Sequence, residues 1–179
     1  MELIFSKTSA RNATLSLPSG QPVYELSTPS RLLHTEQTTI TKFYPGNPPV
    51  TIGLVEMHSF HDDVCQLAGR NVLPKSDGFW KSGMTFTSSN GEHYTWKRKS
   101  DAALLSDKFK HNIAIYEESH SGFLSGTPSP AKLSVAPEGM GILDEIMVTF
   151  VYIEQQEQQS RAASASGASA GAAAAAASG

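Results

Sequence analysis

The amino-acid sequence predicts a mainly β fold, in which about ten to twelve short strands form a closed antiparallel barrel around one buried helix. Short apolar runs separated by turn-forming residues fill residues 1–135, without the alternation of strands and long helices that a parallel sheet requires. A strongly apolar segment, Gly141–Glu154, follows them. We expect residues 1–156 to form this single domain and residues 157–179, which are rich in Ala, Ser and Gly, to be a disordered tail.

The first part of the chain has the pattern of an antiparallel meander. Leu3 and Phe5 alternate with more polar neighbours and share one face of a first strand. The sequences LPSGQP at residues 17–22 and YPGNPP at 44–49 are rich in Pro and Gly and predict turns. The run VTIGLVEMHSF at residues 50–60 then predicts a longer strand.

The clearest hairpin spans Met84–Lys97. Its centre is an Asn90-Gly91 pair, which tolerates the positive φ angles of a tight turn. Tyr94 and Trp96 share one face of the second strand, and aromatic pairs across such a ladder contribute about 0.2–1 kcal/mol each. This segment therefore predicts two paired strands.

The segment at residues 142–153 predicts a buried helix. Asp144 and Glu145 are acidic residues in its first turn, where they favour the positive end of the helix dipole. A helix without a polar face must be buried on nearly all sides, and a barrel interior provides that environment. The predicted core side chains of the helix are Leu143, Ile146, Met147, Phe150, Val151 and Ile153.

Two alternatives to a buried helix exist for this segment. Twelve helical residues rise about 18 Å, whereas a bilayer core is about 30 Å thick, so we expect no transmembrane role. The run VTFVYI at residues 148–153 also has high β-propensity, and a further strand stays open as an alternative.

The chain resembles the tubby-like, or LURP-one-related, fold, in which many short strands form a barrel threaded by a hydrophobic C-terminal helix. More specifically, LDEIMVTFVYIE at residues 143–154 and FTSSNGEHYTWK at residues 86–97 resemble an uncharacterised domain family of basidiomycete fungi assigned to that fold group. The resemblance covers residues 1–156. That family has no established activity, so the resemblance implies a fold and no function.

Composition narrows the classes of partner. The formal net charge of −3 gives no overall attraction to nucleic acid, so we expect no such partner. Cys65 is the only cysteine, which excludes an intramolecular disulfide and a CxxC motif. The first residues lack a basic stretch followed by an apolar run, so we expect an intracellular, cytoplasmic protein. We also expect no cofactor.

A set of lysines is the leading candidate for a ligand site. Lys97 and Lys99 lie in the sequence WKRK, and Lys108 and Lys110 follow shortly after. Neighbouring residues of a strand face opposite sides, so Arg98 does not join them. Animal tubby-like domains bind phosphoinositide headgroups through basic residues on the barrel, and the resemblance implies an anionic headgroup here. A solvated surface is the simpler interpretation of these residues.

Two further patterns suggest chemistry. His58, His61 and Asp63 have side chains that ligate divalent metals, but on a strand the two histidines would face opposite sides, and a polar turn is the simpler interpretation. Cys65 is a nucleophile in principle, although a lone cysteine is usually buried and inert. The GASAG sequence at 167–171 matches a serine nucleophile motif only in composition, because it lies in the tail.

These patterns define three functional hypotheses. The first is a non-enzymatic binding or scaffold module, peripheral to an anionic membrane. The second is an interaction module for an unidentified protein, without a lipid ligand. The third is a metal-dependent hydrolase centred on His58, His61 and Asp63.

Overall fold

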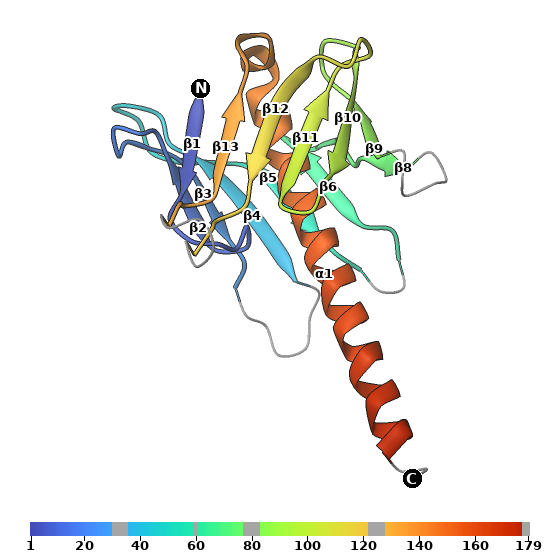
Figure 1. The fold of residues 1–179 in the computed structure, drawn as a ribbon. Coiled ribbons are helices and arrows are strands. Elements are labelled where there is room, and N and C mark those ends of the chain that lie inside the picture. The colour runs from blue at the N-terminus through green and yellow to red at the C-terminus, as the bar shows by residue number, and fades with distance from the viewer. Residues whose placement is uncertain (30–35, 59–60, 77–82, 122–127, 177–179) are drawn as a thin grey trace.

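The computed structural model describes residues 1–29, 36–58, 61–76, 83–121 and 128–176, with side chains as far as residue 165 (Figure 1). They form one antiparallel sheet of thirteen strands, a 3-10 helix and one long α-helix. In chain order the elements are β1 (Glu2–Phe5), β2 (Ala13–Ser16), β3 (Pro22–Ser27), β4 (Gln37–Lys42), β5 (Val50–Glu56), β6 (Val64–Leu67), β7 (Arg70–Asn71), β8 (Lys75–Ser76), β9 (Met84–Thr87), β10 (His93–Arg98), β11 (Ala102–Ser106), β12 (Asn112–Glu117), β13 (Lys132–Val135), η1 (Pro137–Ile142) and α1 (Leu143–Ala176).

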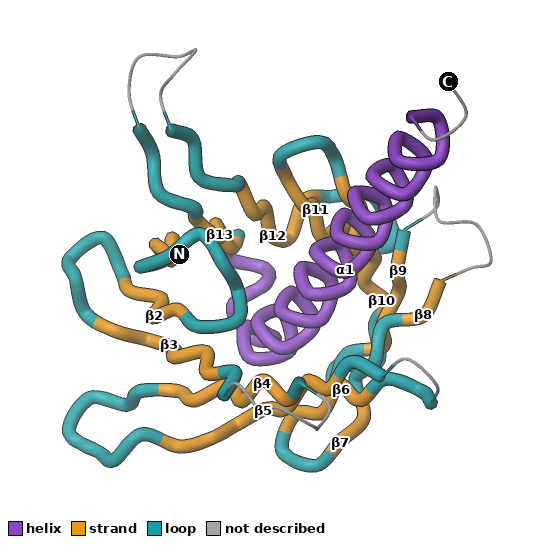
Figure 2. The backbone as a smooth tube through the Cα atoms, turned by 90° about the horizontal axis from the view of Figure 1, so that it is seen from below, coloured by secondary structure: helices purple, strands orange, loops and turns teal. Residues whose placement is uncertain are grey.

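The sheet consists of two meanders that meet in its middle. Strands β1 to β7 pair in sequence order, and so do β8 to β13. The two sets join through β1 and β13, where Leu3 lies opposite Leu133. Strong strand twist lets such a sheet roll up, and Figure 2 shows the strands curved around α1. The inward-facing side chains of both meanders therefore pack on one helix.

The predicted closed barrel is wrong, because the sheet stays open between β7 and β8. Both edge strands are two residues long, and they follow one another in the chain. Val72 still donates to the carbonyl of Cys65, but the N–H of Leu73 is bound by Asn71 Oδ1 at 2.8 Å. Pro74 has no N–H to donate, so the ladder cannot continue through this segment. The two short edge strands also raise the number of strands above the prediction.

Helix α1 fills the space inside the sheet, and the alternative of a further strand is wrong for this segment. Gly53 shows how closely helix and sheet approach, because a Cβ at this residue would lie 2.5 Å from Val148 Cγ2. The helical side chains named from the sequence have exposed fractions between 0 and 8%: Leu143, Ile146, Met147, Phe150, Val151 and Ile153. The apolar segment therefore forms the centre of the core.

The second half of α1 extends beyond the sheet (Figure 1). Residues 157–176 have a helical backbone, which differs from the disordered tail that their composition predicts. Adding residues to an existing helix avoids the nucleation cost, and alanine has the highest helix propensity, so the buried first half can propagate into this segment. The domain boundary after residue 156 stays a prediction.

Candidate functional site

Several turns converge on the end of the sheet where α1 begins, at the top of Figure 1. We call this region the helix-start end; it comprises η1 and the turns at residues 43–49, 68–69, 88–92 and 107–111. Ser88 and Ser89 of one turn bind the first turn of α1, and Lys42 and Arg70 reach the same turn from the adjoining ends of β4 and β7. The helix-start end is therefore one connected surface, although its parts lie far apart in sequence.

Glu145 is the buried centre of this surface, with a side chain only 3% exposed. Its Oε1 accepts a hydrogen bond from the backbone N–H of Ser89 at 2.8 Å, and its carboxylate also binds the Ser88 hydroxyl and the Arg70 guanidinium. A buried carboxylate requires such partners, because an unpaired charge is costly to remove from water. The Arg70 side chain is 41% exposed and keeps part of its guanidinium in contact with solvent.

Asp144 forms a second, more open ion pair beside the first. Lys42 Nζ lies 2.7 and 3.0 Å from the two carboxylate oxygens, and the Tyr24 hydroxyl donates to Oδ1 at 2.5 Å. Burial and the neighbouring carboxylate raise the pKa of Tyr24, so it stays a donor. The Lys42 ammonium also lies 5.3 Å from the centroid of the Tyr44 ring, which is within cation–π range. Asp144 and Tyr44 therefore already surround one ammonium group, that of Lys42.

A cleft of about 760 Å³ opens between these two ion pairs. It is lined by Lys42, Leu67, Ala68, Arg70, Ser89, Met140, Gly141, Ile142, Leu143, Asp144 and Glu145. Ala68 has a φ of 48°, which is rare for a residue with a side chain. It forms with Gly69 the two-residue turn between β6 and β7, where Asn or Gly is the usual first residue. The wall of the cleft therefore contains a strained backbone position.

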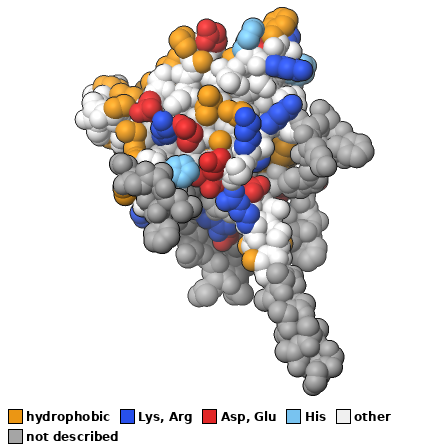
Figure 3. Space-filling model, viewed as in Figure 1, with side chains coloured by type: hydrophobic (Ala, Val, Ile, Leu, Met, Phe, Trp, Pro, Cys, Tyr) orange, Lys and Arg blue, Asp and Glu red, His pale blue; other side chains and the backbone are white. Residues whose placement is uncertain are grey.

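Exposed hydrophobic side chains gather at the same end. The described residues include five large ones that are exposed: Met1, Tyr44, Val50, Phe109 and Met140. Met1 lies there because its ammonium donates to the carbonyl of Val135, just before η1, and Val50 lies there because it pairs with Lys42. At the top of Figure 3 hydrophobic side chains alternate with charged ones. This gathering is unusual, because exposed hydrophobic residues of a monomer are normally scattered.

The turn at residues 107–111 carries the most exposed of them. Phe109 is 69% exposed and lies between Lys108 and Lys110. Asp107 holds the turn, since its Oδ1 accepts from the N–H groups of Phe109 and His111 at 2.9 and 2.8 Å. Although desolvation opposes it, these hydrogen bonds hold the pKa of Asp107 below its usual value. The tip is therefore preorganised, and the Lys108 ammonium lies 5.3 Å from the centroid of the Phe109 ring.

The structure does not bring the four predicted lysines together. Lys97 and Lys99 lie at the far end of β10, whereas Lys108 and Lys110 lie in the turn after β11. The five residues of β11 separate the two pairs by about 17 Å. Lys108 forms an ion pair with Glu92 at 2.9 Å. Only Lys108 and Lys110 therefore belong to the helix-start end.

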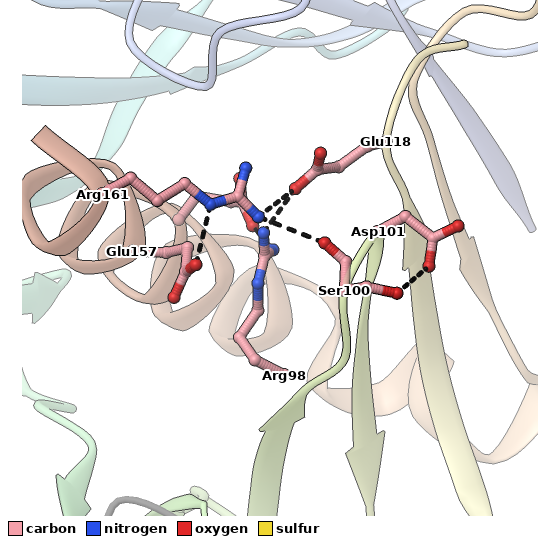
Figure 4. A network of polar contacts seen from close by, with 7 residues as sticks. Arg98, Ser100, Asp101, Glu118, Glu157 and Arg161 are labelled. Atoms are coloured by element: carbon pink, nitrogen blue, oxygen red, sulfur yellow. Dashed lines mark hydrogen bonds and ion pairs between the residues drawn. The ribbon is translucent and has the colours of Figure 1, made fainter. Parts of the chain in front are cut away.

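The end of the sheet where α1 emerges holds a network that anchors the helix. Figure 4 shows Arg98 and Arg161 converging on Glu118, which accepts from them at 2.5 and 3.0 Å. Arg98 also binds Glu154, and Arg161 donates to Glu157 at 2.8 Å. Burial raises the pKa of Glu154 to about 7, although the positive charge of Arg98 acts in the opposite direction. These contacts are internal, which suits a structural role.

The other chemical candidates are engaged in the fold. Asp63 accepts from the backbone N–H of His58 at 2.7 Å and from the Tyr152 hydroxyl at 3.0 Å, and the rings of His58 and His61 are 6.4 Å apart. Across the described part of the chain, no three His, Cys, Asp or Glu side chains are placed to hold a metal ion. Cys65 is buried, and desolvation raises the pKa of its thiol to about 12. A thiol with this pKa is a poor nucleophile.

Sequence reasoning missed the ion pairs of the helix-start end. In the sequence, Asp144 and Glu145 are recognisable only as acids in the first helical turn. Their partners, Lys42 and Arg70, lie 102 and 75 residues away, and no local pattern links them. Two local signals of the helix-start end are visible in the sequence. They are the turn sequence Ala68-Gly69 and the lone Phe109 between two lysines.

The fold and this end together define a class: a rolled antiparallel sheet around one helix, with a polar cleft and exposed apolar tips where the helix begins. The chain belongs to the family of unknown function DUF6593, whose profile matches residues 8–159. No curated protein and no solved structure matches the chain. None of the described helices combines the length and hydropathy that crossing a bilayer requires.

Proposed function

We propose that this protein is a non-enzymatic binding module that docks on an anionic membrane surface through its helix-start end. The observation that carries the proposal is the tip at residues 107–111, where Phe109 is 69% exposed between Lys108 and Lys110. Burial of this ring against a partner would be worth about 1.5–3 kcal/mol. We place the protein in the cell as a peripheral membrane protein.

A lipid surface suits the composition of this end. Aromatic and apolar side chains can enter the boundary between headgroups and acyl chains, while lysine stems reach back to anionic headgroups. Each lysine near such a surface contributes about 1 kcal/mol, which salt reduces. Tyr44 and Met140 are further exposed side chains of the helix-start end. Insertion of several short tips fits separate turns better than it fits one flat protein interface.

The relationship to the tubby-like fold is part of this proposal. An antiparallel sheet rolled around a hydrophobic C-terminal helix supports it, although the sheet is open. The fungal origin and the phosphoinositide class of headgroup are further parts that the resemblance suggests. A protein partner at the same end is the second candidate, and the exposed hydrophobic residues are compatible with it.

Vesicle binding tests the proposal. Full-length protein is sedimented with three kinds of vesicle at low and high salt. The first contains phosphatidylcholine alone, the second also contains phosphatidylserine, and the third contains a phosphoinositide instead. We expect binding only to the anionic vesicles and less binding at high salt. The Phe109→Ser variant should lose about tenfold or more in affinity. The double variant Lys108→Ser with Lys110→Asn should lose a similar amount, and Asn suits residue 110 because its φ is 68°.

A matched control uses the lysines at the other end of the sheet. The double variant Lys97→Ser with Lys99→Ser removes the same charge and should bind vesicles as the wild type does. If this control loses binding while the Lys108 and Lys110 variant keeps it, the site is misplaced. If the wild type binds no anionic vesicle, the lipid proposal is wrong and the protein-partner candidate takes its place.

A further inference from the structure

We infer that the cleft at the helix-start end binds a small zwitterion that carries a phosphate and an ammonium group, of the phosphoethanolamine type. The inference rests on the proposed function, because a group of this type is the headgroup of a phospholipid. It names the ligand that the helix-start end would bind. The chemistry is shared by a free phosphoethanolamine and by the headgroup of a phospholipid. The experiment below separates these two sources.

The charge of the cleft selects a zwitterion. Lys42 and Arg70 supply two positive charges, and Asp144 and Glu145 supply two negative ones. A purely anionic ligand would approach the two carboxylates as well as the two cations, so it would gain little. A ligand with both charges can place its phosphate near Arg70 and its ammonium near Asp144. The cleft volume of about 760 Å³ falls in the range of small-molecule sites.

Each half of the ligand has a partner with spare capacity. Arg70 has five N–H donors, and its bonds to described residues are those to Glu145 and to the carbonyl of Thr87. Its 41% exposed guanidinium can therefore bind phosphate oxygens in the paired geometry that arginine favours. Asp144 is 31% exposed and already holds one ammonium, that of Lys42, beside the Tyr44 ring. A second ammonium can approach its open side.

The cleft also has an apolar wall for the rest of a lipid. Leu67, Met140 and Leu143 line it, and Met140 is among the exposed side chains of this end. Ala68 places a methyl group in the wall at a φ of 48°, where glycine or asparagine would be less strained. Strained positions of this kind cluster at ligand sites, which supports the assignment of the cleft.

Amide chemical shifts of the isotope-labelled full-length chain test the inference. O-phosphoethanolamine is added, followed by two half-ligands, glycerol phosphate and ethanolamine. We expect saturable shifts centred on residues 68–70 and 141–145, and at least about tenfold weaker binding of each half-ligand. Equal binding of glycerol phosphate, or shifts spread evenly over the protein, would overturn the inference.

A blocking variant avoids disturbing the ion pairs. A Cβ at Gly141 would have no heavy atom within 4 Å, so Gly141→Leu fills the cleft without removing a polar contact. It should abolish the response, and Glu138→Leu, which adds a leucine to the same short helix outside the cleft, should not. Asp144→Asn should weaken phosphoethanolamine by about tenfold. Unchanged binding by Gly141→Leu would place the ligand elsewhere and overturn the inference.

Two comparisons separate the sources and the two proposals. Dihexanoyl-phosphatidylethanolamine, a short-chain soluble lipid, should bind about tenfold more tightly than O-phosphoethanolamine if the ligand is a lipid, and no more tightly if it is the free compound. The Phe109→Ser variant should bind O-phosphoethanolamine normally while losing vesicles. Vesicle binding without any phosphoethanolamine response would therefore overturn this inference and leave the docking proposal standing.

Discussion

The indole N–H of Trp96 donates a hydrogen bond to the hydroxyl of Thr149 at 3.0 Å, inside the rolled sheet, where both side chains are buried. The hydroxyl in turn donates to the carbonyl of Glu145 at 2.7 Å. A polar group in the centre of a core is costly unless it is paired, and here the strand and the helix satisfy one another. This bond fixes α1 relative to β10.

Removing the Thr149 hydroxyl should destabilise the protein at nearly constant volume. In Thr149→Val the indole N–H loses its acceptor, which costs about 1–3 kcal/mol in the free energy of unfolding. Thr149→Ser keeps the hydroxyl and serves as the control, with only the loss of a methyl group. Urea denaturation followed by tryptophan fluorescence measures both. If Thr149→Val were as stable as the wild type, the bond would contribute nothing.

The carboxyl group of Glu154 should make stability depend on pH. Burial raises its pKa from 4.5 to about 7, so the folded protein holds a proton in this range that the unfolded chain releases. Its contribution is fully present below about pH 4.5 and is lost as the pH rises through about 7. Relative to Glu154→Gln, the wild type should lose on the order of 3 kcal/mol between these limits.

Denaturation midpoints of the wild type, Glu154→Gln and the surface control Glu138→Gln, measured from pH 4.5 to 7.5, check this expectation. As the pH rises, the wild type should lose stability relative to Glu154→Gln, while Glu138→Gln follows the wild type. A constant difference would mean that Arg98 keeps Glu154 ionised throughout.

Two glycines of the 3-10 helix η1 should respond oppositely to alanine. A Cβ at Gly139 would lie 2.9 Å from both Ile113 Cγ2 and Val135 Cγ1, so Gly139→Ala should cost about 1–3 kcal/mol. Gly141→Ala meets no heavy atom within 4 Å and should leave stability unchanged or raise it by about 0.4–1 kcal/mol. Thermal unfolding of the pair measures the contrast. A similar loss in both variants would show that η1 does not pack as described.

Relief of backbone strain at Ala68 should stabilise the fold. At a φ of 48° a glycine avoids the clash of a Cβ, so Ala68→Gly should raise the free energy of unfolding by about 0.5–1 kcal/mol. The same change at Ala102, a residue of β11 without a positive φ, should lower it by about 0.5–1 kcal/mol. Chemical denaturation compares the two variants. A less stable Ala68→Gly protein would contradict the assigned turn.

Two local patterns predicted the local structure correctly. The Asn90-Gly91 turn lies between β9 and β10 with a φ of 80° at Gly91, and the all-round apolar segment forms the buried part of α1. Closure of the sheet could not be read from the sequence, because it depends on where the N–H of Leu73 is bound, next to Pro74, which has no N–H. Lys99 and Lys108 looked close in sequence, yet an intervening strand places them at opposite ends. Contacts such as Lys42 with Asp144 join distant segments and leave no periodic signal.

The pairing of β1 with β13 sets the order in which the chain can complete its fold during synthesis. Leu3 and Leu133 are neighbours in the middle of the sheet, yet nearly the whole domain must leave the ribosome before they meet. The meander from β1 to β7 emerges first, with its inner apolar face uncovered, and α1 follows only after β13. Such long-range closure is slow, and partly made sheets aggregate readily. Newly made chains should therefore depend on chaperones that shield apolar strands until the helix arrives.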